Sequence, residues 1–367
     1  MTNSTERYAR YTDDVEVIQP GEEKLIDEVV ASFGRVGQQV FDKHRHAVRG
    51  AHAKSHGILK GMLTVHDDLA PHLRQGLFRT PASYPVVVRF SSAPGDIHAD
   101  SVRLPKGMAI KVIGVEGRKV LPGHEDDATQ DFLLVNHPVI PFGTIGVYSL
   151  MQRFVELNAN DSDGTLVAAG ALAKGAAWAL NRVGVESHTL ETAGMPHHHI
   201  LGETFHSMGA VRFGEYIAKI SAAPLSAEVR ALTGQAYDPA HAPSIVRTQI
   251  REFFRENGAS YQLRAQLCRH LETMPIEDAS VVWSEEESPH QPIATIFFPP
   301  QDTYGAARRV YADDVLAFNP WHCLREHRPL GSIMRARKAA YESSAAFRHA
   351  MNAQPRLEPR SIDEIPD

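Results

Sequence analysis

Short apolar runs separated by glycine, proline and aspartate follow one another in the first half of the chain. Four of them, GILKGMLTV, YPVVVRFSS, GMAIKVIGV and DFLLVN, lie between residues 57 and 136. Strands of this length at this spacing are typical of an antiparallel sheet or barrel. The runs AVRFGEYIAKIS and PIATIFFPP predict that strands return between residues 210 and 300.

Helical periodicity appears elsewhere. Apolar residues recur at helical spacing from Leu25 to Phe33, which predicts a helix over residues 22–41. The stretch at 146–185 is rich in Ala and Leu and predicts a helical insertion between strands. APSIVRTQIREFFREN and ASYQLRAQLCRHLETM predict a helical pair between residues 242 and 274, and a last helix carries Tyr341.

This order of elements predicts an α+β fold in one large domain over residues 21–350. The domain would consist of the helix at 22–41, a barrel over about 47–300, and a wrapping loop and final helix over 301–350. We expect a flexible arm at 1–20 and a disordered tail at 351–367, because both stretches are polar.

Composition narrows the classes of partner. Net charge is −6 and no basic tract stands out, so neither nucleic-acid nor anionic-membrane binding is indicated. The apolar runs are far too short for a membrane span. Residues 1–20 lack the apolar core of a secretory signal, and Cys268 and Cys323 match no metal spacing. We therefore expect a cytoplasmic protein without a disulfide.

Two polar residues stand in unexpected surroundings. Arg89 lies in the middle of an apolar strand run, and its burial would require an anion or a full set of acceptors. The alternative is an arginine that faces outward from a half-exposed strand. His52 is flanked by Ala51 and Ala53, which leaves room for a bulky group beside it. The alternative is a structural histidine with satisfied hydrogen bonds.

One face of the last helix carries a third feature. Offsets of four and seven residues place Arg337, Tyr341 and Arg348 on the same side. The alternative is a solvent-facing stripe of arginines. A phenol has a pKa near ~10, and a neighbouring arginine would lower it by about 1–3 units. An ionised tyrosine is a known ligand of haem iron, so this face can serve a ferric haem.

Four blocks of the chain, in the same order, resemble the haem catalases and in particular the compact bacterial catalase-like proteins. RGAHAKSHGILKGMLTVHDD is similar to the segment that carries the distal histidine, and PVVVRFSSAPGDIHADSVRLPKGMAIKV to the block that follows it. DFLLVNHPVI is similar to the block with the distal asparagine, and VLAFNPWHCLREHRPLGSIMRARKAAY to the proximal block ending in R-x-x-x-Y. The resemblance covers Ala47–Val139 and Leu316–Arg348. It implies a catalase-like antiparallel β-barrel with helical insertions and a C-terminal proximal haem helix.

The resemblance also implies roles for individual residues. Tyr341 would be the axial ligand to the iron of haem b (Fe³⁺), and Arg337 would stabilise its phenolate. His52 would be the distal acid–base residue, Ser91 would orient it, and Asn136 would position peroxide.

The same resemblance gives three arginines a common task. Arg49, Arg89 and Arg348 match positions that bind the haem propionates, which would provide the anion that a buried Arg89 needs.

The function that follows is haem-dependent metabolism of peroxide: dismutation of hydrogen peroxide, with peroxidase activity on organic hydroperoxides. Ala51 precedes His52 where catalases carry valine, which widens the expected pocket. Two alternatives stay open: an enzyme that isomerises or dehydrates fatty-acid hydroperoxides, and a haem-binding protein without turnover. We expect a homo-oligomer, a dimer or tetramer. The triple histidine His197–His199 favours a loop over a metal site.

Overall fold

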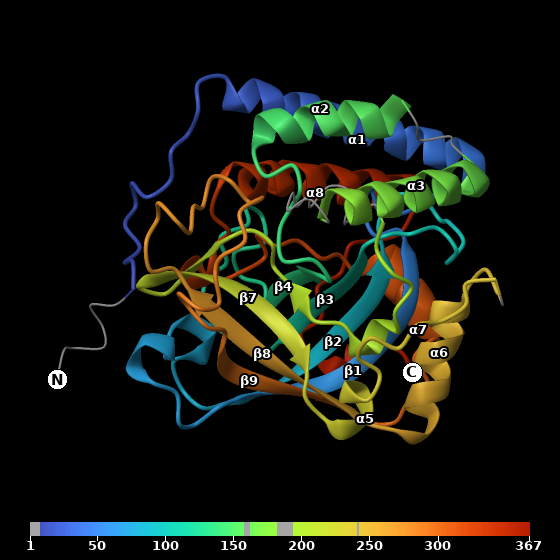
Figure 1. Cartoon of the computed structure of the whole chain (residues 1–367). Coiled ribbons are helices and arrows are strands. Elements are labelled where there is room, and N and C mark those ends of the chain that lie inside the picture. The colour runs from blue at the N-terminus through green and yellow to red at the C-terminus, as the bar shows by residue number, and fades with distance from the viewer. Residues whose placement is uncertain (1–7, 158–161, 182–193, 241) are drawn as a thin grey trace.

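A closed antiparallel β-barrel forms the centre of the protein (Figure 1). The computed structural model describes residues 8–157, 162–181, 194–240 and 242–367. Its strands are β1 (Lys54–Val65), β2 (Ser83–Ser92), β3 (Lys106–Ile113), β4 (Thr129–Val135), β5 (Phe205–His206), β6 (Val211–Phe213), β7 (Tyr216–Pro224), β8 (Ala259–Leu267) and β9 (Gln291–Phe298). The sheet order is β5-β4-β3-β2-β1-β9-β8-β7-β6, and β5 also pairs with β7. Within the described residues, that pairing closes eight strands into a ring, which confirms the predicted barrel.

Side-chain alternation explains how β2 is buried on both faces. Val86, Val88 and Phe90 point into the main core, while Val87 belongs to a second cluster on the opposite face. Arg89 shares the face of Val87, because successive side chains of a strand point to opposite sides. The arginine therefore sits under a covering layer outside the barrel core and is 2% exposed.

Strand β8 corrects one prediction. ASYQLRAQLCRHLETM was expected to be helical, but Ala259–Leu267 is a strand paired with β7 and β9. The buried positions Ala259, Tyr261, Leu263, Ala265 and Leu267 recur every second residue. That period belongs to a strand, and the Ala, Leu, Gln and Arg content that suggested a helix was overruled by pairing on both edges.

Helices cover one side of the barrel, as Figure 1 shows. This layer consists of α1 (Glu22–His44), α2 (Ile145–Leu157), α3 (Asp163–Asn181) and α8 (Ser332–Met351). Helices α5 (Ala227–Arg230), α6 (Ile245–Glu256) and α7 (Ala306–Val310) lie elsewhere around the barrel, and a π-helical turn η5 (Tyr311–Val315) follows α7. Single 3₁₀ turns are η2 (Pro71–Leu73), η3 (Gly76–Phe78), η4 (Ile200–Gly202), η6 (Arg325–His327) and η7 (Ile362–Glu364). Val29 of α1, Ile145 of α2 and Ala336 of α8 pack in one cluster, which joins the three helices.

The helix predicted over residues 22–41 is confirmed and extends to His44, and the stretch predicted to be helical at 242–257 contains α6 (Ile245–Glu256). The predicted insertion at 146–185 contains α2 and α3, and its residues 158–161 and 182–185 lie outside the described residues. None of the helices in the described ranges combines the length and the apolar character that crossing a bilayer requires.

Both terminal segments pack against the domain, where a flexible arm and a disordered tail were expected. The amide of Ala9 donates to the carbonyl of Cys268 at 2.9 Å, and Glu16 accepts from the amide of Gly331 at 2.9 Å. Residues 1–7 of the expected arm lie outside the described residues. In the tail, Ile365 is 1% exposed in the cluster that contains Val87, because it supplies an apolar anchor in an otherwise polar stretch.

Candidate active site between the barrel and the last helix

A cavity of about 430 Å³ separates strands β2, β3 and β4 from helices α1, α2 and α8. This volume is within the range of roughly 300–1,000 Å³ found for ligand and cofactor sites. Apolar side chains form most of its wall, and a few polar groups from separate elements reach it. Seven of the eight residues predicted for the site line it: Arg49, His52, Arg89, Ser91, Arg337, Tyr341 and Arg348.

Helix α8 contributes a hydrogen-bonded pair. The Nη2 atom of Arg337 donates to the Oη atom of Tyr341 at 3.0 Å, and the guanidinium carbon lies 5.2 Å from the centre of the phenol ring. One helical turn separates the two residues, so the regular geometry of α8 sets this contact. The cation is thus in place to stabilise a negative charge on the phenol oxygen.

Tyr148 of α2 lies beside this pair and was missed by the sequence analysis. Burial, and to a smaller extent the neighbouring Tyr341, raise the pKa of Tyr148 to about 12 against the opposing effect of Arg337. Tyr148 therefore stays a neutral phenol on the cavity wall. Tyr148 was missed because it is a single tyrosine within the predicted helical insertion, and no motif marks its position.

His52 precedes β1 and faces the cavity from the barrel side. Its Nδ1 atom lies 3.2 Å from the Oγ atom of Ser91 in β2, and its φ of 55° is left-handed. Gly107 of β3 lies under the ring: a Cβ atom there would come within 2.6 Å of Nδ1. Glycine is thus required for the position of this histidine.

Electrostatics keep His52 neutral. Removal from water lowers the pKa of His52 to about 3, and the positive charges of Arg89 and Arg337 act in the same direction. At neutral pH the ring is unprotonated and can accept a proton.

Three arginines converge on the η5 turn. Arg89 donates from Nε to Oδ1 of Asp313 at 3.0 Å, and Arg49 donates from Nη1 to the same oxygen at 3.3 Å. Arg348 donates from Nη1 to the backbone carbonyls of Asp313 at 2.8 Å and Asp314 at 2.6 Å. The anion next to Arg89 in this structure is therefore a carboxylate of the chain itself, where the resemblance implied a propionate.

This arginine cluster still carries excess positive charge. Burial and then the charges of Arg89 and Arg348 hold the pKa of Arg49 well below its usual value, and burial lowers that of Arg348 to about 10. Burial opposes ionisation of Asp313, but Arg89 and Arg49 outweigh it and lower its pKa. The buried Nε of Arg348 has no hydrogen-bond partner among the described residues. The cluster is thus suited to a further anion at this end of the cavity.

Asn136, the eighth predicted residue, is placed differently. Its Oδ1 atom accepts from the amide of Lys106 at 2.7 Å and its own amide donates back to the carbonyl of Lys106 at 3.0 Å. These bonds extend the β3–β4 ladder past Val135 and use the side chain, so Asn136 is absent from the cavity wall as the structure describes it. The adjacent His137 lines the cavity instead, and its Nδ1 donates to the carbonyl of Val139 at 2.9 Å.

Several histidines outside the cavity are structural. His199 of the triple histidine accepts from the amide of Leu201 at 3.3 Å and caps η4, as expected for a loop. Burial lowers the pKa of a set that we call the low-pKa histidines: His327 to about 3, His199 and His349 to about 4, and His56 well below its usual value. These side chains are held neutral in the folded protein.

Solved structures with a similar fold are catalases. A bacterial catalase has 14% sequence identity and a TM-score of 0.59, with 92% of this chain and 64% of that chain covered. A fungal catalase has 18% identity and a TM-score of 0.59, covering 95% and 68%. Catalase A from Saccharomyces cerevisiae has 17% identity and a TM-score of 0.59, covering 96% and 72%. The chain thus has the catalase fold and spans 64% of the length of the first of these enzymes. No family model and no curated protein sequence matches it.

Proposed function

We propose that this chain is a haem-dependent oxidoreductase that acts on hydrogen peroxide or an organic hydroperoxide. One observation carries the proposal: the Arg337–Tyr341 pair and the His52–Ser91 pair line the same cavity. A ligand for iron and a neutral proton acceptor thus share one enclosed space. The catalase fold supports the oxidoreductase class, and the identity of 14–18% to those enzymes leaves the reaction to be argued from the residues.

The residues present fit a haem b group. Tyr341 would hold the iron, with Arg337 stabilising its phenolate, and the apolar wall would cover the porphyrin faces. The arginine cluster has excess positive charge and an unpartnered buried N–H on Arg348, so it would hold the porphyrin carboxylates. Haem bound here would supply the exchange of electrons with peroxide.

The chain's own contribution is proton transfer and exclusion of water. When Nδ1–H of His52 donates to Ser91, the unprotonated Nε2 takes a proton from one peroxide oxygen and returns it to the other. The low pKa of His52 keeps this nitrogen free at neutral pH. Tyr148 and the apolar residues of α1 and α2 close the cavity on the helical side.

Two measurements test the proposal. The purified protein should show the visible spectrum of a ferric haem with a tyrosine ligand, and oxygen should be released when hydrogen peroxide is added. His52→Ala should retain the spectrum and lose turnover by roughly 10²–10⁴-fold, the usual contribution of general acid–base catalysis. A haem-free protein from haem-replete cells, or unchanged turnover in His52→Ala, would contradict the assignment.

The extent of the apolar wall favours a second candidate, an enzyme for fatty-acid hydroperoxides. Val29 and Phe33 of α1 and Met151 and Val155 of α2 extend the lining beyond the polar groups, which offers contact area for an acyl chain. Consumption of a fatty-acid hydroperoxide without oxygen release would favour this candidate. A haem spectrum with no turnover of either peroxide would instead indicate a haem-binding protein.

A further inference from the structure

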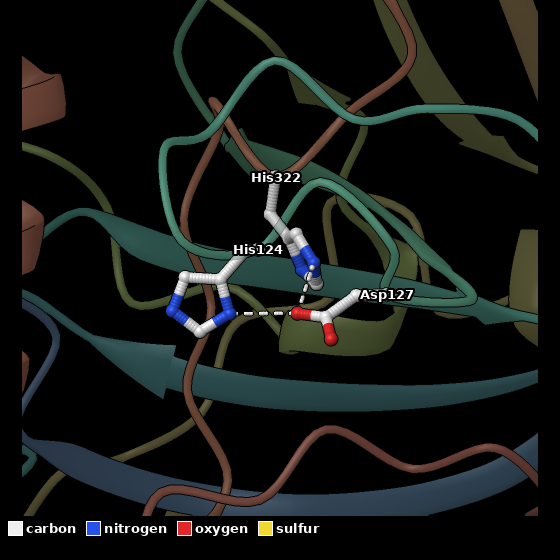
Figure 2. A group of neighbouring side chains, drawn as sticks. All are labelled: His124, Asp127 and His322. Atoms are coloured by element: carbon white, nitrogen blue, oxygen red, sulfur yellow. Dashed lines mark hydrogen bonds and ion pairs between the residues drawn. The ribbon is translucent and has the colours of Figure 1, made fainter.

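A histidine–aspartate–histidine cluster lies outside the cavity, where a loop meets the segment that leads into α8. His124 and Asp127 belong to the loop between β3 and β4, and His322 lies ten residues before the first residue of α8. Nδ1 of His124 is 2.7 Å from Oδ2 of Asp127, and Nε2 of His322 is 3.1 Å from the same oxygen. Figure 2 shows both imidazole rings directed at this one carboxylate.

We propose that His124, Asp127 and His322 bind a divalent cation of the Zn²⁺ type. Their ligand atoms all lie within 4.8 Å of one another. Zn²⁺ binds imidazole nitrogen and carboxylate oxygen at roughly 2.0–2.2 Å, which places tetrahedral ligands ~3.4 Å apart. The observed separations of 2.7 and 3.1 Å would open by ~0.7 and ~0.3 Å to reach this spacing. Two nitrogens and one oxygen form a donor set that suits zinc.

The surroundings of His322 fit a metal ligand. Its ring is 0% exposed, and Nδ1, the nitrogen on the far side from Asp127, lies 3.1 Å from Oγ1 of Thr129. Thr129 in turn donates to Oε2 of Glu358 at 3.2 Å. With a cation on Nε2, the ring proton resides on Nδ1 and donates to Thr129. The Nζ atom of Lys111 lies 3.3 Å from Nδ1 and then directs its protons to Asp131 and Glu358, each at 2.7 Å. A ligating histidine whose other nitrogen donates into a carboxylate-backed network is the usual arrangement at zinc sites.

The local charge also favours a cation. The charged groups packed around the cluster are the carboxylates of Asp127, Asp131, Glu342 and Glu358 and the cations of Lys111, Lys119 and Arg356. Among these groups the negative charges outnumber the positive ones by one, and Glu125 and Asp126 of the same loop add two more negative charges. Lys111 is shared, with Nζ at 2.7 Å from both Asp131 and Glu358.

An ion can enter this cluster from solvent, and a water molecule can fill the fourth coordination position beside the three side chains. The side chains of His124 and Asp127 are 21% and 28% exposed, so an ion can reach them from solvent and retain a water ligand. His322 by contrast is held by the fold: its carbonyl accepts from the amide of Asp131 at 2.9 Å, and its amide donates to the carbonyl of Asn319 at 2.9 Å. A bound cation would therefore tie the exposed loop to the segment that positions α8.

Zinc titration of matched variants tests this. The full-length protein, with whatever haem it carries, is freed of divalent ions on a chelating resin and titrated with ZnCl₂ in a calorimeter. His124→Ala and Asp127→Asn alter the partly exposed ligands without touching the buried His322. His270→Ala is the control, because His270 is an exposed histidine outside the cluster.

The parent and His270→Ala should bind one equivalent of Zn²⁺, and both cluster variants should bind it at least ~100-fold more weakly. Zn²⁺ should also raise the thermal unfolding midpoint of the parent and of His270→Ala, and leave that of His124→Ala unchanged. Equal Zn²⁺ affinity in the parent and both cluster variants, or no stoichiometric binding by the parent, would overturn the proposal. Neither readout depends on the haem assignment.

Discussion

Gly107→Ala is the sharpest test of how the barrel positions His52. The added methyl group would lie 2.6 Å from Nδ1 and 2.7 Å from Cε1 of the ring, and 3.0 Å from Oγ of Ser91. Since ordinary contact begins near ~3.4 Å, the ring must move by roughly 0.8 Å or rotate away from Ser91. A displacement of about 1 Å in a catalytic group can cost ~100-fold in rate, so we expect turnover of hydrogen peroxide to fall by about that factor.

The assay is the initial rate of oxygen release, divided by haem content from the visible spectrum. The spectrum itself should be unchanged, because Gly107 and the Tyr341 pair come from opposite sides of the cavity. Gly146→Ala is the matched control: Gly146 lies in α2, and a Cβ atom there meets nothing within 4 Å. That variant should retain the parent rate.

A double variant separates ring displacement from general damage to the barrel. In a His52→Ala background the new methyl group has no imidazole to displace, so Gly107→Ala should cause little further loss. A loss of the same factor in both backgrounds, or full activity in Gly107→Ala with an intact fold by circular dichroism, would refute the reasoning.

Four further outcomes are expected. Tyr341→Phe removes the phenol oxygen and should change the visible spectrum or the haem content sharply; identical spectra would remove Tyr341 as the ligand. Asp313→Asn deprives Arg89 and its partners of their carboxylate and should lower the free energy of unfolding by roughly 3 kcal/mol in urea titrations; no loss would mean that backbone carbonyls alone hold the arginines. Asn136→Ala should lower the free energy of unfolding by about 1 kcal/mol in the same titration, because the amide of Lys106 loses its acceptor, and should leave turnover unchanged. A large fall in turnover would show that Asn136 takes part in the reaction. The low-pKa histidines stay neutral in the fold but take up protons when unfolded, so stability present above pH ~6.5 is lost as the pH falls. Each of these histidines should lower the free energy of unfolding by roughly 1.4 kcal/mol per pH unit below pH ~6.5, down to its own pKa. A thermal unfolding midpoint that stays constant from pH 6.5 to 4.5 would contradict this.

Most of the barrel could be predicted because its strands are short β-branched runs between turn residues. Strand β8 could not, since its residues are good helix formers and only pairing with β7 and β9 decides their state. The packed terminal segments were missed for a similar reason. Their anchors, such as Glu16 and Ile365, are single residues in polar stretches and form no periodic pattern.

In the site, too, some features could be predicted from the sequence and others could not. Motif order gives the positions that line the cavity, because Tyr341 and Arg337 share a helix face by simple periodicity. It does not give the direction of a side chain after a strand end, so Asn136 was expected in the cavity that His137 lines. Nor does it reveal Asp313, whose contact with Arg89 spans 224 residues of sequence and depends on the final packing of η5.

The anchoring of α8 has a consequence for biosynthesis. Glu16 accepts from Arg335 at 2.6 Å across 319 residues of sequence, and the cavity wall runs from Val29 to Arg348. A ribosome delivers Glu16 319 residues before its partner Arg335. A nascent chain therefore has no complete cavity wall until residue 348 has been added, and a molecule that fills this cavity can be enclosed only after that point.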